Sequence, residues 1–565
     1  MDYDYLLERW FKPMRLNGAQ TLIKLLEDQG VEVIFGYPGG TVLEIYDALL
    51  NSSIKHILVR HEQGAAHAAS GYARATGGVG VCLATSGPGA TNLVTGIATA
   101  YMDSIPIVFF TGQVPQAMVG TDAFQEVDIT GITHPITKHN YLVQDIKDLP
   151  RIVAEAFYIS KTGRPGPVLI DIPRNVSMDI TEFKHCPSVD IRGYKPTTKG
   201  HPAMIKKAVH AIQESKNLVI CTGGGVIHGN ASDEVEQIAH MTKGKVVSTL
   251  MGLGSYPARS KEFFGMLGTY GSQSANEAVQ QCDCLLALGM RFDDRVVGNP
   301  DKFAPNATII HIDIDPAEIG KNIRADIPIV GDIKNILVDM LKLLDKNLIS
   351  NKSIATISPE KMSVPLKTGL NVPWILSQLS KMAPEDILIT TDVGQHQMWT
   401  ATHYAFNKPR SFISSGGLGT MGYGIPAALG VQIAKPDHLV VAITGDGSFQ
   451  MGMTEIGAIA ELGLPIKILI FNNQTLGMVR QLQHYYSGQR YTGVHFENKI
   501  DFVMLAKAFG AEGYRIDDPL EASKIMEKAL HNGKFTIIEC PIDAENLVLP
   551  IVLAGKGLEE MTKNI

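Results

Sequence analysis

Residues 438–452 read HLVVAITGDGSFQMG, an apolar, β-branched run typical of a buried strand, ending in a glycine-flanked aspartate, Asp446. Residues 466–479, IKILIFNNQTLGMV, are a second such run, which ends in two asparagines, Asn472 and Asn473. One strand–helix–strand unit separates Asp446 from Asn473, so both side chains should emerge at the carboxyl edge of one parallel sheet. Open α/β sheets bind their ligands at that edge.

The same alternation of short apolar runs with helical patterns extends through the chain in three blocks, which predicts parallel sheets covered by helices. The fold class we expect is α/β, with three domains that each contain a mainly parallel sheet flanked by helices. The first and third blocks are similar in size and alternation, so we expect a related pair with a different domain between them. The predicted domains are residues 14–185, 195–345 and 370–545, followed by a C-terminal tail, 546–565.

Within the blocks, the strand candidates are the apolar runs, and two helical stretches stand out in the first block. The helices are expected at Gln63–Ala75 and Ala90–Met102, and a Ser-, Lys- and Pro-containing linker is expected at 346–369. The strand candidates are 31–36, 56–59, 79–86, 105–112 and 166–173 in the first block, 217–225, 245–255, 282–289 and 307–315 in the second, and 386–394, 438–448, 466–473 and 535–541 in the third.

Composition narrows the function classes. The chain of 565 residues has 50 basic and 57 acidic side chains, a net charge of −7, so no basic surplus exists for a nucleic acid. No apolar run is long enough to cross a membrane, and the first residues lack the apolar core of a signal peptide. The six cysteines are scattered, and the one close pair, Cys282 and Cys284, is interpreted as the entry to a buried strand rather than a metal site. These features predict a cytoplasmic protein with a small-molecule ligand.

Asp446 and Asn473 predict a metal site. One carboxylate and one amide oxygen form a sparse set of hard ligands, which suits Mg²⁺ whose other positions are filled by water and phosphate oxygens. Gly445 and Gly447 would let the backbone approach that phosphate. Alternatively, GDG is a strand-end turn and NN a helix cap. The two motifs together, at this spacing, favour the metal.

These residues resemble the motif of the thiamine diphosphate-dependent enzymes, GDG followed downstream by NN. The resemblance implies a thiamine diphosphate-binding fold, with Mg²⁺ held by Asp446, Asn473 and the carbonyl of Thr475. It also implies that Met421 wedges the cofactor into a bent form. The implied contacts to thiamine diphosphate are Gly40, Glu62, Val393, Gly394, Gln395, His396, Gly419, Met421, Gly445, Gly447, Ser448 and Met478.

Glu62 follows a short apolar run and begins a helix rich in small residues, which would let the helix pack tightly and enclose its acidic end. A glutamate at a helix start is otherwise usually a surface residue favoured by the helix dipole. In the family that this chain resembles, such a glutamate assists cofactor activation across a subunit interface. The resemblance therefore implies a catalytic Glu62 and a homodimer or homotetramer.

Three further stretches resemble the catalytic subunits of the acetohydroxyacid synthase family: TGQVPQAMVGTDAFQE (111–126), LGMRFDDRVVGNPDKF (288–303) and GRPGPVLIDIP (163–173). The resemblance implies decarboxylation of pyruvate on thiamine diphosphate and ligation of the hydroxyethyl group to pyruvate or 2-ketobutyrate. This is the first common step of valine, leucine and isoleucine biosynthesis. It implies catalytic roles for Phe124, Gln125 and Arg295 besides Glu62 and Met421, and a small regulatory subunit as partner.

The resemblance also implies bound FAD. The residues alone indicate only that CTGGG and HIDID flank a glycine turn able to hold a nucleotide-like group, or a tight strand–helix connection. Arg295 would meet the carboxylate of the incoming 2-keto acid, or else form a surface ion pair with Asp293 or Asp294. The implied FAD contacts are Arg164, Gly223, Gly224, Gly225, Thr249, Leu250, Gly289, Arg291, Asp293, Arg295, Asp313 and Asp332.

Two rival enzyme functions remain open, besides a non-catalytic binding protein on this fold, and the most consequential departure from the family pattern is at residue 482. A flavin-dependent pyruvate oxidase would share the fold and cofactors, and a catabolic acetolactate synthase would need no flavin. Leu482 stands where the biosynthetic enzymes typically have tryptophan. Losing that aromatic wall predicts a weaker preference for 2-ketobutyrate as second substrate and lower sensitivity to sulfonylurea-type inhibitors.

Overall fold

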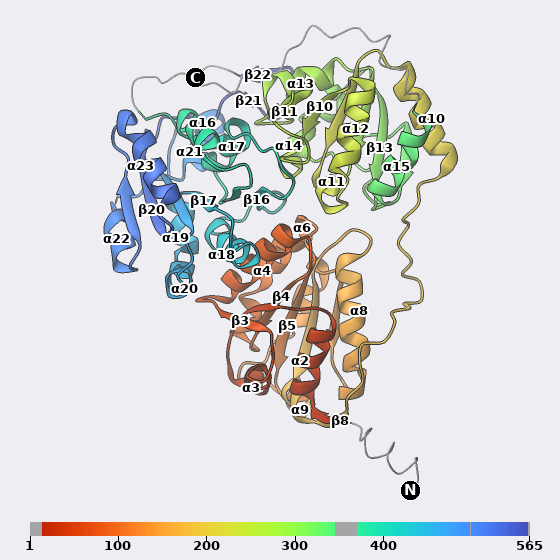
Figure 1. The fold of residues 1–565 in the computed structure, drawn as a ribbon, viewed down its shortest axis with the longest axis vertical. Helices are drawn as coiled ribbons and strands as arrows, with labels where there is room; N and C mark the ends of the chain where they lie inside the picture. Colours follow the sequence, from red (N-terminus) through yellow and green to blue (C-terminus); the bar gives the residue numbers. More distant parts are fainter. Residues whose placement is uncertain (1–13, 345–369, 498, 563–565) are drawn as a thin grey trace. The chain divides into compact units, whose positions relative to one another are not determined.

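The computed structural model describes residues 14–344, 370–497 and 499–562. The chain forms two compact units, which divide between Lys195 and Pro196. The first unit contains one six-stranded sheet and the second contains two (Figure 1). The linker predicted at 346–369 lies outside the described residues.

The sheet of the first unit is parallel throughout, with strand order β3-β2-β4-β5-β7-β6. Helices α2 (Gly18–Asp28), α3 (Leu43–Leu49) and α8 (Leu149–Lys161) bury their apolar residues with one face of this sheet. On the other face, α4 (Glu62–Thr76) packs so closely that a Cβ on Gly80 would lie 2.4 Å from the Ala69 carbonyl. The strands are β2 (Val33–Tyr37), β3 (Lys55–Leu58), β4 (Gly80–Ala84), β5 (Ile107–Gln113), β6 (His139–Leu142) and β7 (Val168–Pro173).

The helical stretch predicted at Ala90–Met102 is helical in the structure, but it is divided by a break at residues 92–93. The structure has a short α5 (Pro88–Thr91) and a separate α6 (Val94–Met102). Backbone bonding changes at the break, because the Leu93 amide donates to the Ala90 carbonyl, three residues back. Asn92, in the break, donates its side-chain amide to Glu62 Oε2 at 2.9 Å. The other predicted helix, Gln63–Ala75, agrees with α4 to within one residue at each end.

The middle sheet is also parallel, but its strand order is β11-β10-β9-β12-β13-β14. Helices α10 (Pro202–Glu214), α12 (Ser232–Thr242) and α15 (Ile333–Leu343) share one apolar core, whereas α13 (Gln273–Gln280) belongs to a second. The strands are β9 (Leu218–Thr222), β10 (Lys245–Ser248), β11 (Phe263–Met266), β12 (Cys284–Leu288), β13 (Thr308–Asp313) and β14 (Ile327–Val330).

The third sheet has the order β16-β15-β17-β18-β20-β19, again all parallel. Helices α16 (Val372–Met382), α17 (Gln395–His403) and α23 (Pro519–His531) contribute to one core, and α18 (Gly424–Ala434) lies against β15 and β17. The strands are β15 (Leu388–Thr391), β16 (Phe412–Ser414), β17 (Val440–Gly445), β18 (Lys467–Asn472), β19 (Glu512–Arg515) and β20 (Thr536–Pro541).

These sheets confirm the predicted fold class of three helix-flanked, mainly parallel sheets. Numbered from each sheet's first strand, the first and third share the order 2-1-3-4-6-5, whereas the middle sheet has 3-2-1-4-5-6. The expected likeness of the first and third blocks therefore holds for strand order.

The C-terminal segment packs back on the middle sheet's helices. β21 (Ile551–Val552) pairs with β22 (Met561–Thr562), and the Val552 amide donates to the Thr269 carbonyl at 2.9 Å. Lys302 and Glu560 form an ion pair of 2.6 Å.

All six cysteines carry free thiols, and β12 begins at Cys284 as expected. Among the described residues, no helix combines the length and apolar character needed to cross a membrane.

Candidate cofactor site

Three neighbouring strands of the third sheet end at one pocket. Residues 393–396 follow β15, Gly445–Ser448 end β17 and begin α19 (Asp446–Gly452), and Asn473 follows β18. The chain reverses its direction of winding between β15 and β17, which is where open α/β sheets bind ligands. Twelve predicted residues line the pocket: Val393, Gly394, Gln395, His396, Met421, Gly445, Asp446, Gly447, Ser448, Asn473, Thr475 and Met478.

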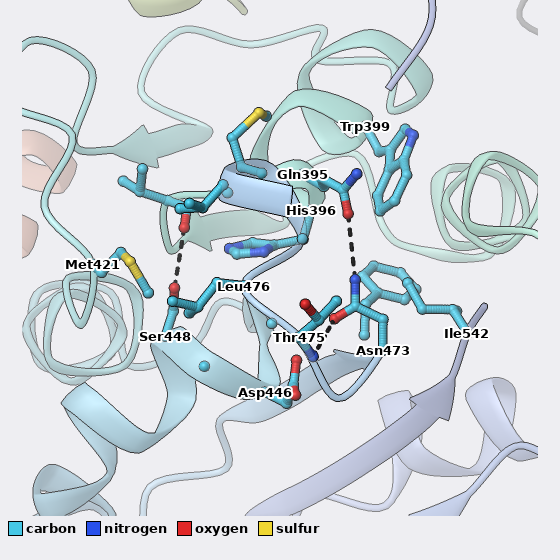
Figure 2. Close-up of a pocket in the computed structure, with 18 residues that line it drawn as sticks. Gln395, His396, Trp399, Met421, Asp446, Ser448, Asn473, Thr475, Leu476 and Ile542 are labelled. Carbon is cyan, nitrogen blue, oxygen red and sulfur yellow. Dashed lines mark hydrogen bonds between the residues drawn. The ribbon is translucent and has the colours of Figure 1, made fainter. Parts of the chain in front are cut away.

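Asn473 is held in a fixed orientation at the edge of this pocket. Its Nδ2 donates to Gln395 Oε1 at 3.3 Å, and its Oδ1 accepts the Thr475 amide at 3.2 Å (Figure 2). A glycine in the turn after it leaves room for this pair of amides, because a Cβ on Gly477 would lie 2.1 Å from Gln395 Oε1 and displace that side chain. The loop is pinned further by Thr475, whose hydroxyl donates to the Val494 carbonyl at 2.7 Å.

Asp446 is buried at the start of α19, and Figure 2 shows it on the same side of the pocket as Asn473 and Thr475. Burial raises the pKa of Asp446 to about 6, and surrounding backbone amides, including those of Gly447 and Asn473, oppose this rise. A cation beside the carboxylate would remove this penalty, because it favours the ionised form.

The charge balance of the pocket favours a cation together with an anionic ligand. Its 18 lining residues lie within the part of the chain that the structure describes, and none of them is lysine or arginine. Helices α17 and α21 (Gly477–Tyr486) begin at the pocket, and the free amides at their N-termini favour an anion. A diphosphate here would therefore depend on helix N-termini and on a metal rather than on basic side chains.

His396 provides a buried polar atom without a partner. Burial lowers the pKa of His396 to about 3, so the imidazole is neutral, and its Nε2 has no hydrogen-bond partner in the described part of the chain. Such atoms are rare in native structures, so a bound molecule or water is needed to satisfy it. A neutral imidazole, a carboxylate, an amide oxygen and two helix N-termini together fit the metal–diphosphate group implied above.

The glycines at the pocket are explained by the packing of the protein itself. Gly394 has φ +152°, and a Cβ there would lie 2.9 Å from His396 Cε1. A Cβ on Gly445 would lie 3.0 Å from His396 Nδ1, and one on Gly447 would lie 2.8 Å from Leu476 Cδ2. Predicted Gly419 is not among the lining residues, although it has the left-handed φ of +70° and lies near Val393.

Sequence reasoning missed the apolar wall of the pocket, which suits the ring system of a cofactor. The additional lining residues are Trp399, Phe471, Leu476, Gly477, Val479 and Ile542. It also missed Asp392, a fully buried carboxylate that accepts the Gly424 amide (3.0 Å) and the Thr444 hydroxyl (2.9 Å). Burial raises the pKa of Asp392, and its position directly after β15 was the available signal.

Glu62 lies in the first unit, at the start of α4, where it is half-buried. Its carboxylate accepts Asn92 Nδ2, and a Cβ on Gly89 would lie 3.3 Å from its Oε1. Gly40 begins the 3₁₀ turn after β2 and has open space around it. Phe124 and Gln125 lie on the loop after β5, where Phe124 is 87% exposed and Gln125 has φ +60°.

The predicted FAD residues of the second unit gather at the carboxyl edge of the middle sheet. Gly223–Gly225 follow β9, Thr249 and Leu250 follow β10, Gly289 and Arg291 follow β12, and Asp313 ends β13. The winding direction reverses between β9 and β12, as expected of a nucleotide-like site.

Several of these residues also have partners within the chain. Gly225 donates its amide to the Gly289 carbonyl, and a Cβ on Gly225 would lie 2.7 Å from Gly289 Cα, so the glycine turn also serves close strand–helix packing. Asp293 caps α14 (Asp294–Val297) and Asp332 caps α15.

The remaining two predicted FAD residues, Arg295 and Arg164, have polar partners within their own units. Arg295 is exposed and its Nε is 3.5 Å from Asp294 Oδ2, which corresponds to the surface ion pair considered as its alternative. Arg164 belongs to the first unit, where its Nε donates to the Ser104 hydroxyl at 2.8 Å.

The chain matches known proteins over almost its entire length and family models over three separate stretches. Residues 16–132, 205–340 and 392–540 match the N-terminal TPP binding, central and C-terminal TPP binding domains of thiamine pyrophosphate enzymes. A probable acetolactate synthase large subunit from Methanocaldococcus jannaschii is 48% identical, covering 97% of this chain and 96% of that protein. An acetolactate synthase from Mycobacterium bovis is 46% identical (97% and 91%), and an acetolactate synthase large subunit from Buchnera aphidicola is 44% identical (97% and 98%).

Proposed function

The chain belongs to the thiamine pyrophosphate enzymes, among the acetolactate synthase large subunits, and we propose that it catalyses the acetolactate synthase reaction. It decarboxylates pyruvate and joins the two-carbon unit to a second 2-keto acid, pyruvate or 2-ketobutyrate. The observation that carries this proposal is that Asp446 and Asn473 lie at adjacent strand ends, in a pocket whose lining has no lysine or arginine.

Asp446, Asn473 and the Thr475 carbonyl would hold Mg²⁺, and the predicted lining residues from Val393 to Met478 would hold thiamine diphosphate. When bound, thiamine diphosphate supplies the electron sink that allows a 2-keto acid to lose CO₂. The chain's own contribution is binding and orientation. Ser448 fixes its loop by donating to the Val393 carbonyl (3.0 Å). The N-terminal amides of helices α17 and α21 would bind the diphosphate, and Met421 would support the bent form of the cofactor.

Glu62 is the proposed proton-holding group for the pyrimidine ring of the cofactor. Its Oε2 is already oriented by Asn92, so the carboxyl group is fixed at the start of α4. Since the family builds this site across subunits, we propose a homodimer or homotetramer. Arg295 is proposed to bind the carboxylate of the second 2-keto acid, because a planar guanidinium pairs with carboxylates in a forked geometry.

FAD is proposed for the carboxyl edge of the middle sheet, where a topological switch and the glycine turn support a nucleotide-like ligand. A small regulatory subunit is proposed as partner, since two of the relatives described above are named large subunits. The cytoplasm is the proposed location, in keeping with six free thiols.

The test is to incubate the purified chain with thiamine diphosphate, Mg²⁺, FAD and equal amounts of pyruvate and 2-ketobutyrate, and to quantify both acetohydroxy acids. We expect both products, with 2-acetolactate in excess. Glu62→Gln, which keeps the side chain's size, is expected to reduce both products strongly. Acetate or acetyl phosphate in place of acetohydroxy acids would instead identify a pyruvate oxidase, a function that the names of the relatives do not favour.

A further inference from the structure

The loop of residues 114–128 connects β5 to α7 (Ile129–Thr133) in the first unit and carries Phe124 and Gln125. The loop has its own internal structure, because the Glu126 carboxylate accepts the backbone amides of Gly120 and Ala123. These amides hold the pKa of Glu126 below its usual value. Internal bonds fix the shape of the loop. Its middle packs closely at Gly87, where an added Cβ would lie 2.8 Å from the Gln125 carbonyl oxygen, and its two ends are joined to the sheet by hydrogen bonds.

Gln113, the last residue of β5, contacts both ends of this loop and is buried. Its Oε1 accepts the amide of Val114, where the loop begins, at 2.8 Å. Its Nε2 donates to the carbonyl of Val127, near the end of the loop, at 2.8 Å. The same Nε2 donates at 3.0 Å to Asp171 Oδ2. One side-chain amide thus closes the base of a loop that is otherwise well exposed.

Asp171 determines which way the Gln113 amide faces. It lies in β7, paired in register with Thr111, and its Oδ1 accepts the Thr111 hydroxyl at 2.7 Å. Asp171 Oδ2 accepts the bond from Gln113, and this selects the orientation in which Nε2 faces Asp171 and Oε1 faces away. In that orientation the second Nε2 proton remains for Val127.

Other hydrogen bonds are also made at the two ends of the loop. Gln116 and Asn175 exchange hydrogen bonds of 2.9 and 2.7 Å, which gives the start of the loop a second connection to the chain after β7. The Val127 carbonyl also accepts the Ile129 amide, a local bond within the loop end. Gln113 therefore provides the contact from Val127 to the sheet.

We propose that Gln113 is a positioning residue that clamps both ends of the 114–128 loop and thereby holds Phe124 and Gln125 in place for the second 2-keto acid. The proposal rests on the proposed function, which places these two residues at the reacting centre. Gln113 itself acts through the loop and does not touch the substrate.

The first test measures the loop directly, without reference to activity. Gln113→Met keeps the size of the side chain and removes its hydrogen bonds. Thr111→Val removes the other donor to Asp171 and leaves the clamp intact, so it is the matched control. Phe124 is exposed, so chymotrypsin cleavage after Phe124, identified by fragment mass, reports the open population of the loop. One net hydrogen bond shifts such a population by up to roughly tenfold. We expect Gln113→Met to accelerate this cleavage by about that factor and Thr111→Val to leave it unchanged.

The second test measures catalysis. Gln113→Met is expected to raise KM for the second 2-keto acid several-fold and to change the ratio of the two acetohydroxy acids, whereas Thr111→Val changes neither. Asp171→Asn keeps an oxygen acceptor for Gln113 and should retain both loop protection and product ratio. If Gln113→Met does not fold, Gln113→Asn, which is too short to reach both partners, takes its place.

Wild-type cleavage rates in Gln113→Met would overturn the clamp, as would identical cleavage and kinetics in Gln113→Met and Thr111→Val. The proposed function fails separately: a wild-type chain that makes no acetohydroxy acid would refute it, while the cleavage rates would still decide whether Gln113 holds the loop.

Discussion

Asp446 couples the candidate metal site to pH. Burial raises its pKa to about 6, so in the metal-free protein the carboxyl group takes up a proton as the pH falls through that value. A metal must displace this proton. We therefore expect the Mg²⁺ dissociation constant, measured calorimetrically with thiamine diphosphate present, to be nearly constant above pH 7 and to rise about tenfold per pH unit well below pH 6.

The control for this pH dependence is Asp446→Asn, which has no proton to displace and should bind Mg²⁺ weakly at every pH. An Mg²⁺ affinity of the wild-type protein that does not change between pH 5 and 8 would contradict the proposed role of Asp446.

Asp171 should make the free energy of unfolding depend on pH, with its contribution decreasing as the pH rises. Burial raises its pKa to about 7, against the usual 3.8, so the folded protein keeps this proton at pH values where the unfolded chain has lost it. The contribution of Asp171 to the free energy of unfolding is therefore most favourable below about pH 4 and is lost as the pH rises toward 7, by about 1.4 kcal/mol per unit of pKa difference. Denaturant unfolding of the wild type and Asp171→Asn from pH 4 to 8 should show the difference between them shrinking or reversing in this direction. Parallel pH profiles would refute it.

Leu482 is predicted to affect the choice between pyruvate and 2-ketobutyrate as second substrate. It lies on α21 four residues after Met478, on the same helix face as that pocket residue, and is 38% exposed. Leu482→Trp is expected to raise the ratio of acetohydroxybutyrate to acetolactate severalfold from an equal mixture of the two acceptors, because a lost contact of this kind is worth about 1–3 kcal/mol. Turnover of pyruvate alone is the control, and an unchanged ratio would show that another residue selects the acceptor.

Among the elements, the central strands were predictable and most of the edge strands were not. Each predicted apolar run contains a strand of the structure, because strands buried on both faces must be apolar along their length. The missed edge strands are short and carry polar residues, glycine or proline, so no periodic pattern indicates them: they are β6, β11, β14, β16 and β19. The break between α5 and α6 was missed because the bond from Asn92 to Glu62 connects residues far apart in sequence.

Some residues of the candidate site were likewise predictable from the sequence and others were not. Asp446 and Asn473 were predictable because a polar residue directly after a buried strand must emerge at the sheet edge. Trp399 and Ile542 were not, since they reach the pocket from the inner face of α17 and from the residue after β20, and only the folded sheet brings them together.

The turn after β18 should influence the affinity for Mg²⁺. In Gly477→Ala the new Cβ would lie 2.1 Å from Gln395 Oε1 and 2.6 Å from Asn473 Nδ2, so the two amides must separate. We expect Mg²⁺ affinity to fall at least tenfold, while the thermal unfolding midpoint changes little. Gly78→Ala is the control, because its added Cβ approaches only the Thr76 hydroxyl, at 3.3 Å. Equal Mg²⁺ affinities in the two variants would show that this turn does not set the metal site.

The three large sheets of the molecule place their candidate functional residues in the same way. Each sheet has a topological switch, and in each the residues singled out for chemistry follow the strands at its carboxyl edge: Glu62 after β3, Gly223–Gly225 after β9 and Asp446 at the end of β17. The sequence indicates these positions locally, but the C-terminal segment carries no such pattern. Its attachment, through Val552 to Thr269 and Glu560 to Lys302, is a tertiary contact that only the structure reveals.

The central claim is that Asp446 and Asn473 hold a metal through which the third sheet binds thiamine diphosphate. The most direct measurement is equilibrium binding of thiamine diphosphate to the purified chain, with and without Mg²⁺, in the wild type and in Asp446→Ala. We expect one site per chain whose affinity in the wild type falls at least a hundredfold when Mg²⁺ is removed, and an Asp446→Ala variant that binds weakly whether Mg²⁺ is present or not. Tight binding by the wild type without a divalent metal, or by Asp446→Ala in its presence, would contradict it.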